Sequence, residues 1–201
     1  MAYSDFTLAR LKNKFNLLVE EQRDLFAGVE PIPPSDFLAR TLAETVELAL
    51  AINTEKARSE LIIAPLLLEV RRRGNGGISL FSGTDFNIAP EQGLNGFCDF
   101  ILSGSKEQLT INAPVAIVLE AKNEDIKGGL GQCGAAMLAA QLFNQQEGNE
   151  AKTIYGAVTT GDIWKFLKLA GDRLFIDLSN FYIKDVDKIL GCLLEAIGEL
   201  V

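Results

Sequence analysis

The hydrophobic period of the chain changes at the glycine-rich segment 74–77, and this change restricts the possible folds more than any other feature. Before it, apolar residues recur at helical spacing, which predicts helices over 5–26, 36–52 and 54–73. After it, short apolar runs are separated by turn residues, as is typical of strands. The expected strands lie at 78–83, 86–89, 96–104 and 114–122, and the short gaps between them favour antiparallel hairpins.

The second half of the chain returns to helix and then to strands. A glycine-containing turn at 128–131 is expected to open an alanine-rich helix, and the last amphipathic helix is expected from about 185 to 201. This order predicts an α/β (mixed α+β) fold with helices packed on a mixed sheet. The strands expected between these two helices cover 152–160, 163–170 and 173–178.

The length of 201 residues suits one domain. We divide it into an N-terminal helical addition (1–52), a core (54–178) and a C-terminal helix (185–201). No apolar run is long enough to span a bilayer, and the first residues do not follow the pattern of a signal peptide. Three cysteines without CxxC spacing indicate reduced thiols, so we expect a cytoplasmic protein with no membrane partner.

The chain contains no histidine, and this excludes several classes of catalytic site. Ser-His-Asp triads, Cys-His dyads and His-ligated zinc all require an imidazole. Acid–base or metal chemistry must then rely on carboxylates, lysine and water, which favours Mg²⁺ or Mn²⁺. The net charge of −8 argues against tight general nucleic-acid binding, although a local basic rim can act against an acidic average.

The segment VLEAK places Glu120 and Lys122 on one face of a strand that otherwise reads as buried. Asp99 is the only charge in the run GFCDFIL, on what is expected to be the neighbouring hairpin strand. Cross-strand pairing would bring the Asp99 and Glu120 carboxylates together, and a divalent cation would relieve their repulsion. Lys122 could hold a water molecule or offset developing negative charge. The competing interpretation is a solvated strand end.

A third acid could come from the helix before the sheet. We expect Glu60 to complete a metal site or to hold a water molecule there. Glu69 is a rival, but the following VRRRG suggests the solvated end of the helix.

Together these residues resemble the PD-(D/E)XK nuclease superfamily, in particular the branch of the N-terminal nuclease domain of type I restriction motor subunits. The resemblance covers about 54–178 and rests on Asp99 in IAPEQGLNGFCDFIL, PVAIVLEAK, GQCGAAMLAAQ and YGAVTTGDIWKFLKL. Cys98 departs from the proline that the family nominally places before the aspartate. The family often carries a glutamine on the helix after the E-x-K strand; Gln132 and Gln141 are the candidates, and Gln132 is nearer to Lys122.

The resemblance implies a restriction-endonuclease-like core of αβββαβ order and a hydrolase acting on DNA, a Mg²⁺-dependent endodeoxyribonuclease. Asp99, Glu120 and Glu60 would hold Mg²⁺ or Mn²⁺, Lys122 would position the attacking water, and Gln132 would orient the site. A homodimer would suit double-strand cleavage, although no residue requires one. The alternative is the same fold used as a non-catalytic scaffold that binds nucleic acid or protein.

Overall fold

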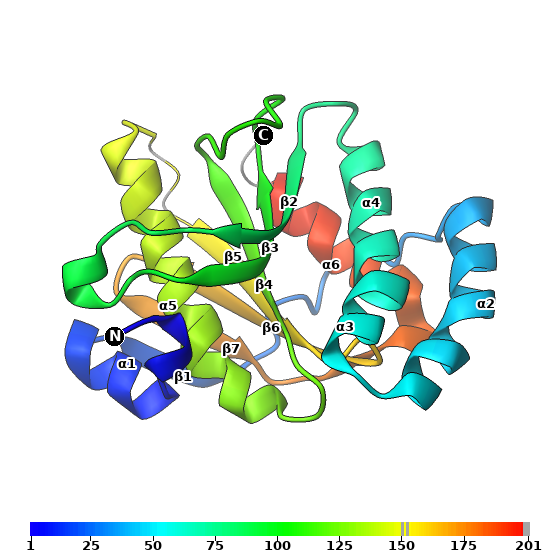
Figure 1. Cartoon of the computed structure of the whole chain (residues 1–201), viewed down its shortest axis with the longest axis horizontal. Coiled ribbons are helices and arrows are strands. Elements are labelled where there is room, and N and C mark those ends of the chain that lie inside the picture. Colours follow the sequence, from blue (N-terminus) through cyan, green and yellow to red (C-terminus); the bar gives the residue numbers. More distant parts are fainter. Residues whose placement is uncertain (150, 152, 199–201) are drawn as a thin grey trace.

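The residues that the computed structural model describes, 1–149, 151 and 153–198, fold around a mixed sheet of eight strands with helices on both faces (Figure 1). The strand order is β1-β7-β6-β5-β4-β3-β2, and β8 pairs with β6. The pairs β1–β7 and β4–β5 are parallel, and the other pairs are antiparallel. The structure therefore confirms the mixed α/β architecture and the antiparallel hairpins β2–β3 and β3–β4.

The bounds of the elements are as follows. The strands are β1 (Leu18–Arg23), β2 (Ser79–Asp85), β3 (Phe97–Ser103), β4 (Val115–Ala121), β5 (Thr153–Thr159), β6 (Ile163–Ala170), β7 (Arg173–Asp177) and β8 (Phe181–Tyr182). The helices are α1 (Leu8–Phe15), α2 (Asp36–Ile52), α3 (Glu55–Arg58), α4 (Ala64–Arg73), α5 (Ile126–Gln146) and α6 (Val186–Gly198), with a π-helical turn η2 (Ser59–Ile63) and short 3₁₀ turns η1 (Tyr3–Asp5), η3 (Pro90–Gln92) and η4 (Ile183–Asp185).

Two hydrophobic cores lie on opposite faces of the sheet. One core packs α4 and α6 against the sheet, with α2 on the outer side of α4, and the other packs α1 and α5 against the opposite face (Figure 1). Helix α5 connects the parallel strands β4 and β5, and its buried surface consists mainly of glycine and alanine. Small side chains let this helix lie close to the sheet directly after the E-x-K strand.

The helix expected over 5–26 is wrong. Helix α1 ends at Phe15, the following Asn16 adopts a left-handed conformation (φ 53°), and residues 18–23 form the edge strand β1 beside β7. Strand β1 is largely exposed and has only one paired edge, so it lacks the alternation of apolar and polar residues that would indicate a strand. The N-terminal segment is consequently not purely helical but contributes a strand to the sheet.

Two other boundaries also differ from expectation. Residues 86–89 form no strand; Ala89 makes one isolated bridge to Leu94 around η3. Residues 128–131 do not precede α5 but lie inside it, because Asp125 caps the helix by accepting a hydrogen bond from the Gly128 N–H at 2.8 Å. Residues 152 and 199–201 of the expected strand and final helix lie outside the described residues.

The helical segment before the sheet is continuous across Pro65. Thr54 caps α3, and the chain passes through η2 into α4 without a break. Proline lacks an N–H and cannot bond the carbonyl four residues back. That carbonyl, of Leu61, accepts a hydrogen bond from the Thr45 hydroxyl at 2.6 Å, so α2 satisfies the group that Pro65 leaves free. Among the described helices, none is long and apolar enough to cross a membrane.

Candidate active site

The antiparallel register of β3 and β4 brings Asp99 and Glu120 together. Phe100 pairs with Leu119, so Asp99 and Glu120 are the next residues along the two strands, on the face that α5 covers. Asp99 Oδ2 accepts the Ala121 backbone N–H at 2.8 Å, which fixes its carboxylate at the end of β4. On the other side of Asp99, β2 presents Gly83, whose missing side chain would meet no atom within 4 Å. The space beside Asp99 is therefore open on the β2 side.

Glu120 is 4% exposed, and this burial is the main reason why its pKa rises to about 8. The nearby charge of Asp99 raises the pKa further, and Lys122 opposes the rise. The carboxyl groups of Asp99 and Glu120 lie within hydrogen-bonding range of one another, so ionising Glu120 beside Asp99 costs free energy.

Lys122 completes a three-residue contact with Glu120 and Gln132. Its Nζ lies 2.7 Å from Glu120 Oε1 and 3.1 Å from Gln132 Oε1. Its backbone N–H donates to the Thr159 carbonyl at 2.8 Å, so β5 holds the chain just after β4 ends. The other candidate glutamine, Gln141, bonds the Gly171 carbonyl instead. Gln132, the candidate nearer to Lys122, is therefore the glutamine that contacts the lysine.

Gly129 provides the space in which Lys122 lies. A Cβ at this position would be 2.6 Å from Val158 Cγ1 and 3.2 Å from Lys122 Cε and Cγ. The side chain of residue 129 must therefore be absent if α5 is to pack on β5 beside the lysine stem.

Substitution Gly129→Ala is expected to destabilise the protein by about 1–3 kcal/mol, because the added methyl overpacks a buried contact. Gly198→Ala is the matched control, since a Cβ there meets nothing within 4 Å and alanine favours helix by up to about 1 kcal/mol. Urea unfolding of both variants measures the difference. Equal stability of the two variants would show that Gly129 does not set the helix position.

The ion pair of Glu60 is with Lys56 and not with a residue of this cluster. Its carboxylate is exposed and lies 3.7 Å from Lys56 Nζ. The helical acid that is coupled to the site is Glu55: partial burial raises its pKa, Lys122 lowers it and Asp99 raises it. Glu55 and Glu60 are five residues apart, which turns them roughly 140° from one another on a helix.

Glu69 is not at a solvated helix end, contrary to expectation. It is 3% exposed, and its carboxylate accepts hydrogen bonds from the Ser35 hydroxyl at 2.8 Å and from Arg73 at 2.9 Å. Burial would raise its pKa, but these hydrogen bonds lower it overall. Glu69 thus anchors the start of α2 to α4 and takes no part in the cluster.

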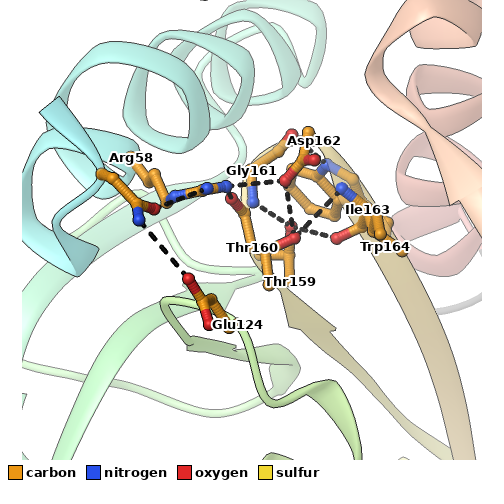
Figure 2. A network of polar contacts seen from close by, with 9 residues as sticks. Arg58, Glu124, Thr159, Thr160, Gly161, Asp162, Ile163 and Trp164 are labelled. Carbon is orange, nitrogen blue, oxygen red and sulfur yellow. Dashed lines mark hydrogen bonds and ion pairs between the residues drawn. The ribbon is translucent and has the colours of Figure 1, made fainter. Parts of the chain in front are cut away.

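Arg58 joins three segments around the site (Figure 2). Its guanidinium donates to the Thr160 carbonyl at 2.6 Å, to Asp162 Oδ1 at 2.7 Å and to Asn53 Oδ1 at 3.0 Å. Asn53 in turn donates to Glu124 Oε1 at 3.4 Å, in the loop that follows Lys122. The start of α3, the β5–β6 turn and the β4–α5 loop are consequently fixed relative to one another.

The donor set of the acid pair fits a hard divalent cation. Asp99 and Glu120 supply carboxylate oxygens, which Mg²⁺ and Mn²⁺ prefer, and Mg²⁺ commonly keeps several water ligands. Their like-charge contact, seen in the raised pKa of Glu120, is one that a cation would relieve. Among the described residues, no group of three or more Cys, Asp or Glu side chains is arranged to hold a metal ion. Any ion here would depend on two carboxylates and water.

Comparisons of the chain with protein-family models, curated proteins and solved structures return no match. The geometry of Asp99, Glu120, Lys122 and Gln132 is therefore the basis for assigning a function.

Proposed function

We propose that the protein is a metal-dependent endodeoxyribonuclease with a restriction-endonuclease-like core. The observation that carries this proposal is the meeting of Asp99, Glu120 and Lys122 at the ends of β3 and β4, with one buried acid held at a raised pKa of about 8. Perturbed acids grouped with a lysine are typical of catalytic sites. The buried, unpaired cysteines are consistent with a protein that acts in the cytoplasm, where thiols stay reduced.

Each residue has a role that follows from its contacts. A bound Mg²⁺ or Mn²⁺ would supply charge to stabilise the attacking and leaving oxygens of phosphodiester hydrolysis. Asp99 and Glu120 would hold that ion, and the Ala121 N–H keeps Asp99 oriented. Lys122 holds and orients the attacking water, and its charge offsets the negative charge of the scissile phosphate. Gln132 fixes the lysine ammonium, and Glu55 adds negative charge at the rim.

A specific observation favours one other function. The ammonium of Lys122 already closes on Glu120 at 2.7 Å, so the cluster can balance part of its charge without a cation. The alternative is therefore a scaffold that uses this fold to bind nucleic acid or protein without cleavage. Such a scaffold would bind no metal ion at the acid pair.

Nicking of supercoiled plasmid tests the proposed function. We expect cleavage with Mg²⁺ or Mn²⁺ that stops with EDTA, and a loss of at least about a thousandfold in Asp99→Asn, because the ion loses a ligand. The acids of the preceding helix provide the matched pair: Glu55→Gln is expected to alter the rate, whereas Glu60→Gln is expected to leave it unchanged. Metal-dependent cleavage that persists in Asp99→Asn would contradict this site.

A further inference from the structure

A cavity of about 850 Å³ lies beside the first turns of α5, outside the acid–lysine cluster. Its walls are mainly apolar and come from α1, β1, β7 and α5; they include Leu8, Val19, Leu130 and Ile176. The volume falls in the range of roughly 300–1,000 Å³ that is usual for small-molecule sites. An apolar cavity of this size can enclose a flat ring system that is not already stacked or paired.

The cavity and the acid pair lie on the same face of the sheet. Glu120 pairs with Val158 and Val158 with Lys165, so the three residues form one row across β4, β5 and β6. Lys165 lines the cavity and is two strand spacings from Glu120, or roughly 10 Å. The first turns of α5 pack on Val158, between the acid pair and the cavity. Gly129 faces Lys122, and Leu130 faces the cavity.

The charges around the cavity favour an anion. Lys12, Lys127 and Lys165 line it, together with two acids, Glu21 and Asp125. The Lys165 ammonium donates to the Leu178 and Ser179 carbonyls, whereas Lys12 and Lys127 are exposed. The carboxylate of Asp125 accepts the Gly128 N–H, so its charge is offset by the start of α5. Lys12 and Lys127 are therefore the two lysines of the lining that can contact an anionic ligand.

We propose that this cavity binds an unpaired nucleotide of the substrate strand, next to the nucleotide whose phosphate reaches Lys122. The apolar walls take the base, as they can only when the base is outside a duplex, and Lys12 and Lys127 contact its phosphate. The inference rests on the proposed nuclease function and narrows its substrate class to DNA with a single-stranded segment or a flipped base.

The test is the binding of a labelled single-stranded oligonucleotide, and of the same sequence as a blunt duplex, measured by fluorescence anisotropy. All variants carry Glu120→Gln, so that turnover does not change the probe. Ala9→Trp, at an exposed position that lines the cavity, is expected to weaken single-strand binding at least about tenfold and to leave duplex binding unchanged. Ala51→Trp, on the exposed side of α2, is the matched control and is expected to change neither.

The salt dependence of binding tests the lysines. Lys12→Ala with Lys127→Ala is expected to lower the slope of log affinity against log salt by about 1.4, because each lysine contact releases about 0.7 counterion from a single strand. The double variant Lys106→Ala and Lys188→Ala removes the same charge at exposed positions and is expected to keep the slope.

Two results would overturn the inference: no single-strand binding by the Glu120→Gln protein, or equal single-strand affinity in Ala9→Trp and Ala51→Trp. Neither result depends on cleavage. A protein that binds single strands through this cavity but does not nick plasmid would instead contradict the proposed nuclease and retain the binding site.

Discussion

Substitution Glu120→Gln is expected to abolish cleavage and, in metal-free protein at pH 8, to raise the melting temperature. Burial and the charge of Asp99 hold the pKa of Glu120 at about 8, well above that of an unfolded glutamate. Glutamine keeps the shape of the side chain and can still accept the Lys122 hydrogen bond, but it carries no charge that must be buried. It also removes a carboxylate that the proposed ion requires.

The sign of the pH effect follows from proton linkage. Between the unfolded pKa near 4.5 and the folded value of about 8, the folded protein keeps the Glu120 proton and the unfolded chain releases it. Stability therefore falls as the pH rises through this window. A difference on the order of 2 kcal/mol corresponds to roughly 4–8 °C for a chain of this size.

Thermal unfolding in EDTA at pH 5 and pH 8 measures this effect. We expect Glu120→Gln and the wild type to melt within about 2 °C of one another at pH 5, and the variant to melt later at pH 8. Glu44→Gln, on the exposed face of α2, removes the same charge and is expected to have little effect at either pH. A variant that melts earlier than the wild type at pH 8 would show that ionised Glu120 stabilises the fold.

Substitution Arg58→Met is expected to destabilise the protein by about 1–3 kcal/mol, because it leaves the carbonyl of the buried Thr160 without its hydrogen-bond donor. The Arg58 side chain is 10% exposed, and its guanidinium satisfies the Thr160 carbonyl, Asp162 and Asn53 together (Figure 2). The Asp162 side chain is about a third exposed, so water screens its ion pair with Arg58 and losing that pair costs less free energy. The Thr160 carbonyl, in a buried residue, contributes the larger share.

Urea unfolding of Arg58→Met beside Arg40→Met measures this loss. Arg40 is exposed on α2, and its substitution is expected to change the free energy of unfolding by less than about 0.5 kcal/mol. Because Arg58 also fixes the loop after Lys122, plasmid nicking by Arg58→Met should fall under conditions in which the variant is still folded. Wild-type stability in Arg58→Met would mean that the three segments hold their places without the guanidinium.

The cluster of Asp99, Glu120 and Lys122 could be predicted because it depends on local rules. Alternation along a strand places Glu120 and Lys122 on one face, and a short hairpin connection places Asp99 on the adjacent strand. The resemblance implied a glutamine on the next helix, and nearness to Lys122 favoured Gln132 over Gln141. The order of helices and strands likewise predicted a mixed sheet with helices packed on it.

The helical acid and the edge strand could not be predicted in the same way. Thr54 fixes where the helix begins, but the choice between Glu55 and Glu60 depends on how the helix is rotated against the sheet, and tertiary packing sets that rotation. The Lys56–Glu60 spacing, an i,i+4 pair typical of a solvated helix face, was a local signal against Glu60. Strand β1 forms because β7 offers it a parallel edge far along the chain, which local spacing does not reveal.

The central claim is that Asp99 and Glu120 form a metal site, and calorimetric titration with Mn²⁺ at pH 7 tests it most directly. We predict one saturable site that is lost in Asp99→Asn and kept in Glu60→Gln. Binding should release close to one proton, since Glu120 with a pKa of about 8 is largely protonated before the ion binds, and the released proton makes the heat depend on the buffer. A folded wild-type protein that shows no saturable Mn²⁺ binding, or an isotherm unchanged in Asp99→Asn, would contradict the claim.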